Sequence, residues 1–172
     1  MTAPLLVLVH PGSACGSANM NLGRFDARAA RESLIQELKD WRGGVLVIEG
    51  SLSDELADYP NFADAIAGAL HRAKVAGAIS LRVFGSDDND FNQTKATQAF
   101  LAEHALDTAT SAITLTGAWY DDTGLDGCVN DVERVFLDHG YRCEISECAL
   151  SLPEGLDEDE EPGDEYSEGF SP

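Results

Sequence analysis

The chain has 172 residues, of which 44% are hydrophobic, so it is long enough for one domain with a sizeable core. Its formal net charge is −20, from 11 Lys and Arg against 31 Asp and Glu. This charge argues against non-specific binding to nucleic acid or to an anionic membrane surface, and it permits a basic protein partner. The apolar run PLLVLV near the start is too short for a signal sequence or a membrane-spanning helix. We therefore expect a cytoplasmic protein with reduced thiols and no membrane association.

The first element is a continuous apolar run over residues 5–9, which predicts a strand in a central parallel position. A loop of small residues follows it over residues 10–23 (HPGSACGSANMNLG). Such a loop can present backbone N–H groups to an anion, which makes phosphate or nucleotide binding one hypothesis and a tight loop without a ligand the other. The loop matches neither the P-loop pattern nor GxGxxG. Its candidate ligand-binding residues are Gly12, Ser13, Cys15 and Gly16.

The middle of the chain alternates helical and strand patterns. Helices are predicted over residues 26–43, 61–77 and 94–106, and strands over residues 45–49 and 79–84. In the first helix Arg31 is expected on the outward face, and residues 51–60 read as a polar, acidic loop. The acidic loop over residues 85–92 (GSDDNDFN) lacks the Gly and the distal Glu of an EF-hand, so we predict no metal site there. Asp87 stays a candidate ligand-binding residue of this loop.

The stretch from residue 112 to residue 148 continues the alternation of strand and helix. Residues 112–116 (AITLT) predict a buried strand that ends at Gly117. The helix that starts at Cys128 is expected to be capped by Asp121, Asp122 or Thr123 and to end at Gly140, a plausible left-handed position. A strand nearer the edge of the sheet is predicted over residues 141–147.

Five strands alternating with four helices predict an α/β fold, a single doubly wound (Rossmann-like) domain with a mostly parallel sheet over residues 1–152. Residues 153–172 form an acidic tail, with nine acidic residues and no Lys or Arg over residues 154–172. This composition predicts disorder. The tail either serves solubility or binds a basic partner, with Tyr166 and Phe170 as part of a short motif.

Ligands of open parallel sheets bind beyond the carboxyl ends of the strands. The candidate site residues that follow the predicted strands are therefore expected at one edge of the sheet. Cys128 at a helix N-terminus would have its thiolate favoured by the helix dipole, and His10 or a nearby Asp would act as its base in covalent catalysis. Cys15 is an alternative nucleophile. Trp119 and Asp122 are candidate ligand-binding residues. The competing interpretations are that Cys128 is a small buried hydrophobe, that His10 merely ends a strand, and that Trp119 packs over the sheet edge.

The order of Cys128-Val129, Gly140-Tyr141, Glu147 and Ala149 resembles the isochorismatase-like cysteine hydrolases. In that family a strand ends in Gly, a loop leads to Cys-Val at a helix start, and the helix ends in Gly-Tyr before a strand closed by an acidic residue and Ala. The resemblance implies a three-layer α/β fold with Cys128 as the nucleophile, and it covers about a fifth of the chain.

The resemblance has two departures at the catalytic positions. Val9 or His10 stands where the family has its Asp, and the family's Lys has no counterpart near residues 85–91, since Lys95 falls within the predicted helix. The loop from Gly117 to Cys128 is also longer than in the family. The sequence therefore favours a diverged, weak or inactive cysteine hydrolase for a small amide-like substrate. The alternative is a non-enzymatic acidic interaction protein that binds a basic protein partner or mimics the charge of nucleic acid. It predicts no particular cofactor, substrate or oligomeric state.

Overall fold

Strand and helix alternate along the chain in the computed structural model, which describes residues 4–15, 27–50, 53–83, 93–107, 112–124 and 127–151. The strands are β1 (Leu5–Val9), β2 (Gly44–Ile48), β3 (Ser80–Val83), β4 (Ala112–Tyr120), β5 (Arg142–Ile145) and β6 (Leu150–Ser151). The α-helices are α1 (Ala27–Asp40), α2 (Pro60–Val75), α3 (Gln93–Glu103) and α4 (Cys128–Asp138), and two short 3₁₀ helices are η1 (Pro11–Ala14) and η3 (Ser53–Asp58). The predicted α/β fold is confirmed.

The strands form one parallel sheet in the order β3-β2-β1-β4-β5, with β6 paired to the far end of β4. β1 lies in the middle, as its unbroken apolar run predicts, and β5 lies at an edge. From β1 the chain first builds outward through β2 and β3, then returns to place β4 on the other side of β1. The strand order therefore reverses between β1 and β4, which is the topological switch point of a doubly wound sheet.

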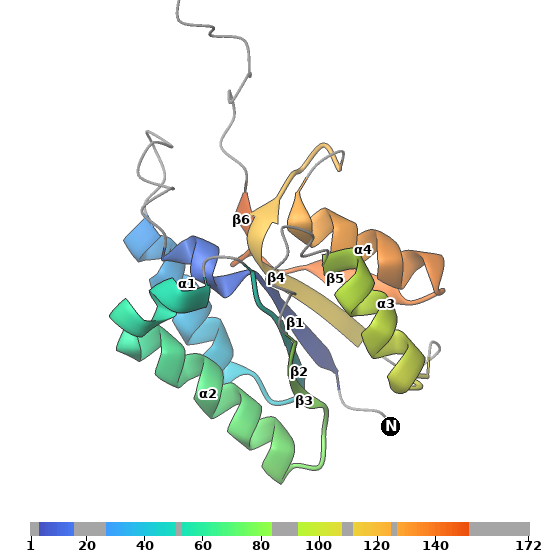
Figure 1. The fold of residues 1–172 in the computed structure, drawn as a ribbon, viewed down its shortest axis with the longest axis horizontal. Coiled ribbons are helices and arrows are strands. Elements are labelled where there is room, and N and C mark those ends of the chain that lie inside the picture. Colours follow the sequence, from blue (N-terminus) through green and yellow to red (C-terminus); the bar gives the residue numbers. More distant parts are fainter. Residues whose placement is uncertain are drawn as a thin grey trace, which may run out of the picture.

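The helices cover both faces of the sheet (Figure 1). On one face α1 and α2 pack over side chains such as Leu6, Leu8 and Val47. On the other face α3 and α4 pack over Val7 and Ile48. Because successive residues of a strand point to opposite faces, the continuous apolar runs of β1 and β2 supply both cores at once.

Two strand predictions need correction. β4 does not end at Gly117 but continues to Tyr120, because Gly117 adopts a positive φ of 102° and stays paired with Val9 of β1. The short strand β6 was not predicted, since two residues carry no readable periodicity. The polar loop over residues 51–60 contains the 3₁₀ helix η3.

Two helix predictions also need correction. The residue that caps α4 is Gly127, without a side-chain cap, while the Asp121 carboxylate accepts hydrogen bonds from the N–H and the hydroxyl of Thr123 and closes a turn. Arg31 does not face outward into solvent: its guanidinium donates to the Ala14 carbonyl (2.9 Å) and lies over the Tyr59 ring. The predicted end of α4 at Gly140 is confirmed by its φ of 83°.

The tail over residues 153–172, which the sequence predicts to be disordered, lies outside the described residues. Within the described ranges, no helix has the length and apolar character needed to cross a membrane.

Gly117→Ala is expected to lower the free energy of unfolding by more than ~3 kcal/mol. A Cβ at this position would overlap the Val9 carbonyl oxygen and lie 2.7 Å from the Val9 nitrogen, in the middle of the sheet. The matched control is Gly140→Ala, which has a similar positive φ but no atom within 4 Å of the added Cβ, and which should cost ~1 kcal/mol. Urea denaturation measures both; equal losses would contradict the role given to the close approach.

Candidate functional site

The candidate site lies where β1 and β4 diverge, at the carboxyl edge of the sheet. β1 ends at Val9, opposite Gly117, and β4 runs on through Ala118 and Trp119 toward the start of α4. The peptide bond between Ala118 and Trp119 is cis. This edge is the region where ligands of doubly wound sheets bind, and it carries His10 directly after β1 and Trp119 near the end of β4.

Cys128 is the first residue of α4 and is half-buried. Burial and the Asp131 carboxylate raise the pKa of its thiol above the ordinary value, and backbone hydrogen bonds from Trp119 and from Cys128 itself offset part of that increase. Both backbone groups thus act on the thiol as hydrogen-bond donors do, in favour of the thiolate. The sequence predicted a lowered pKa from the helix N-terminus. The structure differs because desolvation outweighs these donors.

Asn130 fastens the start of α4 to the end of β4. Its side chain is 2% exposed, accepts a hydrogen bond from the Asp121 N–H (2.8 Å) and donates one to the Asp121 carbonyl (3.0 Å). The N-cap Gly127 lies so close to the Trp119 carbonyl that a Cβ there would be 2.7 Å from its oxygen. These contacts hold Cys128 beside Trp119.

Asn130 is not among the site residues predicted from the sequence. In the sequence Asn130 is a polar residue between Val129 and Val132 of a predicted helix. A polar residue is ordinary on a helix face exposed to solvent. It indicates a structural hydrogen bond only when that face is known to be buried. Asp131 was not predicted as a site residue either. It lies three residues after Cys128 on the same helix, a spacing that places two side chains on one face.

His10 directly follows β1 and occupies the left-handed region, with a φ of 45°. Its backbone N–H donates to the Ile48 carbonyl (2.8 Å), and its ring lies against Gly50, where a Cβ would be 3.0 Å from the ring Cδ2. Burial lowers the pKa of His10 to about 4. The described contacts of the ring are thus on the β2 side of β1, whereas Cys128 lies beside the end of β4.

Glu49 is a second residue that the sequence analysis did not select. It follows β2, its side chain is 2% exposed, and one carboxylate oxygen lies 3.0 Å from the Arg82 guanidinium. Its other oxygen has no hydrogen-bond partner. Burial raises the pKa of Glu49, while Arg82 acts in the opposite direction. The signal in the sequence was an acidic residue directly after the apolar run VLVI.

The first loop, which the sequence proposed as a ligand-binding segment, forms η1. The backbone N–H groups of Ser13 and Cys15 donate to the carbonyls of His10 and Gly12, so neither N–H is directed at an anion. Cys15 is buried, and desolvation raises the pKa of its thiol to about 11. As a nucleophile it is therefore weaker than an exposed cysteine.

The remaining predicted residues fall in different places. Trp119 is partly buried against the core under α1 and α2, and Asp122 is exposed in the turn after β4. Gly16 and Asp87 lie outside the described residues. Over the described ranges, no group of three or more His, Cys, Asp and Glu side chains is arranged to hold a metal ion.

Fold and site together define an α/β protein with a doubly wound parallel sheet and a half-buried cysteine beside the switch point. Comparison with protein families, curated proteins and solved structures finds no match to this chain.

Asn130→Ala is expected to lower the free energy of unfolding by ~2 kcal/mol, because it removes the two hydrogen bonds that the buried Asn130 side chain makes with the N–H and the carbonyl of Asp121. It should also increase the rate at which a thiol reagent reaches Cys128 in the folded protein. Asn61→Ala, at an exposed position of α2, is the control and should change stability by less than ~0.5 kcal/mol. Urea denaturation and thiol labelling measure the two effects. Equal stability of the two variants would rule out the fastening role.

His10→Asn is expected to reduce the loss of stability on acidification. The unfolded chain binds a proton at this imidazole below about pH 6.5, whereas the folded protein does so only near pH 4. Between these values the unfolded state binds more protons, so the contribution of neutral His10 is complete above pH 6.5 and is lost as the pH falls toward 4. Asn also tolerates the left-handed backbone.

The measurement is the drop in Tm between pH 7 and pH 4.5, in the variant and in the wild type. The raised pKa of Glu49 gives a pH dependence of opposite sign, which is present in both proteins and cancels in the comparison. His71→Asn, at an exposed position of α2, serves as the control. An unchanged drop in His10→Asn would mean that this imidazole does not titrate with unfolding.

Proposed function

We propose that the protein is a diverged isochorismatase-like α/β domain and a weak cysteine hydrolase of small amide-like substrates. The observation that carries this proposal is the position of Cys128 as the first residue of α4, half-buried and next to the close approach of Gly127 and Trp119. Backbone groups of Trp119 and Cys128 act there to favour the thiolate. A cysteine held in this way beside the switch point of a doubly wound sheet has the surroundings that covalent catalysis on a carbonyl needs.

In the proposed reaction the Cys128 thiol gives its proton to a base, and the sulfur forms a bond to the carbonyl carbon of the amide. The nitrogen leaves with a proton as the amine, and water then splits the thioester to release the carboxylic acid and restore the thiol. The backbone N–H groups of Trp119 and Cys128 would donate hydrogen bonds to the carbonyl oxygen as negative charge develops on it.

The proposed activity is weak because a strong base is missing beside the thiol. Asp131 is the nearest charged group that acts on Cys128, but its carboxylate already accepts from Gln93 Nε2 (2.6 Å) and pairs with Arg134 (3.2 Å). His10 is neutral at pH 7, and its low pKa of about 4 makes it a poor proton acceptor. Its ring also lies on the β2 side of β1.

A second candidate function is favoured by the charge of the chain. The net charge is −20, and residues 154–172 alone contribute nine acidic side chains without a Lys or Arg. We propose as the alternative a non-enzymatic protein that binds a basic protein partner through this segment, with binding that weakens as salt rises. In either case four free cysteines fit a reducing compartment, and we propose the cytoplasm.

The experiment that tests the hydrolase proposal is the pH dependence of Cys128 alkylation by iodoacetamide, in the wild type and in Asp131→Asn. In the wild type Cys128 should react slowly at pH 7 and faster above pH 9, because its thiol pKa is raised. Removing the Asp131 charge should shift this profile to lower pH and raise the rate at pH 8 about 3-fold. Peptide mass mapping separates Cys128 from Cys15, Cys143 and Cys148.

Hydrolysis is measured in parallel as ammonia release from a panel of simple aliphatic and aromatic primary amides. Cys128→Ala should abolish it, with Cys143→Ala as the matched control because that thiol, whose pKa is about 12, is also half-buried. If Asp131 is the base, Asp131→Asn should lower hydrolysis even though it speeds alkylation. Hydrolysis that survives Cys128→Ala, or a thiol that reacts only after unfolding, would sink the proposal.

A further inference from the structure

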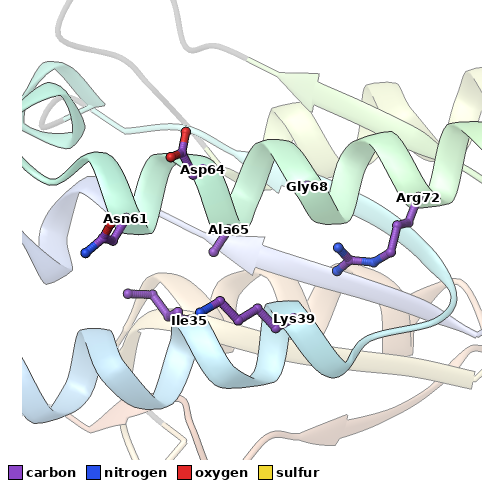
Figure 2. A pocket seen from close by; sticks show the side chains of 7 residues that line it. All are labelled: Ile35, Lys39, Asn61, Asp64, Ala65, Gly68 and Arg72. Atoms are coloured by element: carbon purple, nitrogen blue, oxygen red, sulfur yellow. The ribbon is translucent and has the colours of Figure 1, made fainter.

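A groove of about 540 Å³ runs between α1 and α2 (Figure 2). α2 contributes two small residues to the lining, Ala65 and Gly68, and their short side chains leave space between the two helices. Figure 2 shows Lys39 of α1 and Arg72 of α2 with their cationic ends directed along the groove, while Asp64 points away from α1.

Arg72 is held in place by a contact with α1. One of its terminal nitrogens donates to the Leu38 carbonyl (2.5 Å), and another lies 3.4 Å from where a Cβ on Gly68 would be. Its Nε is buried and donates no hydrogen bond. Among the residues that the structure describes, neither Lys39 nor Arg72 forms an ion pair. Within the described ranges the groove therefore contains two cations outside any ion pair, with the Asp64 carboxylate in the lining but directed away from α1.

A second, smaller hollow of about 300 Å³ continues the groove, since the two share Ile35 and Asn61. It is lined by Arg28 and Arg31. Arg28 pairs with Glu32, but both side chains are largely exposed, so this pair is weak. Four basic side chains thus line one continuous surface along α1 and α2, which we call the basic groove: Arg28, Arg31, Lys39 and Arg72. Three acidic side chains also line it, namely Glu32, Asp58 and Asp64.

The basic groove is exceptional in a chain of this charge. Together α1 and α2 carry five basic and four acidic side chains, a net charge of +1, although the whole chain carries −20. A free anion would have to approach against the field of the whole protein. An acidic segment tethered to the same chain meets no such barrier, because its effective concentration is on the order of millimolar.

The chain leaves the described fold beside α1, on the face of this helix opposite to Ile35 and Lys39, so it has to pass around α1 to reach the basic groove. Leu150 of β6 packs in the core formed with Leu34 and Leu38 of α1, and the preceding Ser146 donates to the Glu37 carboxylate of α1. Residues 152–172 follow, and 21 residues can span up to about 70 Å. The length of α2, about 24 Å, lies well within that reach.

We propose that the basic groove between α1 and α2 is an intramolecular docking site for the acidic segment over residues 154–172. Carboxylates of this segment supply the counter-charge that Lys39 and Arg72 lack among the described residues. Docking would also withhold the segment from a basic partner, so that such a partner must compete with the protein's own groove. The inference is independent of any chemistry at Cys128.

Zero-length carbodiimide cross-linking of the full chain tests this proposal, because it joins a lysine to a carboxylate in contact with it. The chain has three lysines: Lys39 in the groove, Lys74 at the end of α2, and Lys95 on α3 across the sheet. Cross-links from Lys39 to residues 154–172 should exceed those from Lys95 about 10-fold at low salt, and should be lost at 0.5 M salt. Peptide mass mapping reads out each pair.

Two variants complete the test. Arg72→Ser should lower the Lys39 cross-links several-fold and leave those of Lys95 unchanged. Replacing Asp and Glu over residues 157–161 by Asn and Gln should increase the rate of Lys39 acetylation by an N-hydroxysuccinimide ester about 3-fold, without altering Lys95. This second variant changes no residue of the described fold, so it does not depend on whether Arg72→Ser folds.

Three results would overturn the proposal. The first is equal cross-linking of Lys39 and Lys95. The second is a mixed-isotope cross-link in an equal mixture of ¹⁴N and ¹⁵N protein, which would assign the groove to a second copy of the chain. The third is protection of Lys39 that persists in the neutralised variant and disappears on dialysis out of phosphate buffer, which would assign the groove to a free anion.

Discussion

The close approach of β1 and β4 at the pair Val9–Gly117 is the constraint on which the rest of this structure depends. The strand order reverses at this pair, so the helices that follow β1 and β4 go to opposite faces of the sheet. No side chain fits between the two backbones at Gly117. Because Gly117 keeps β4 in the ladder, the strand continues to Trp119, and a backbone group of Trp119 acts on the thiol of Cys128.

The pKa of the Cys128 thiol is set by two opposing effects that both come from the close packing around the sulfur. Backbone groups of Trp119 and Cys128 favour the thiolate, but the same close packing removes water from the sulfur. Asp131 adds repulsion from the same face of the helix. The result is a thiol that needs a base before it can react. Asp131 and His10 do not meet this need easily, one because its carboxylate is already paired and the other because its pKa is low.

Charge is distributed unevenly over the molecule, and this distribution has a structural basis. Helices α1 and α2 pack their apolar stripes on the sheet and on each other, which leaves long basic side chains along their common border. Of the 31 acidic residues of the chain, nine lie over residues 154–172. The border of α1 and α2 carries four basic and three acidic side chains, and the proposed docking would bring the acidic segment to this border.

The sequence by itself determined the fold class, the central place of residues 5–9 and the end of α4 at Gly140, because apolar runs, helical periodicity and glycine stops are local properties. It also placed Cys128 at a helix start. The strand order, the extension of β4 past Gly117 and the burial of Asn130 and Glu49 were decided by the tertiary structure. Burial and hydrogen-bond partners come from residues far apart in the chain, and they alone set whether a polar side chain is solvated, paired or shifted in pKa. For the same reason the raised pKa of Cys128 could not be inferred from its position on the helix.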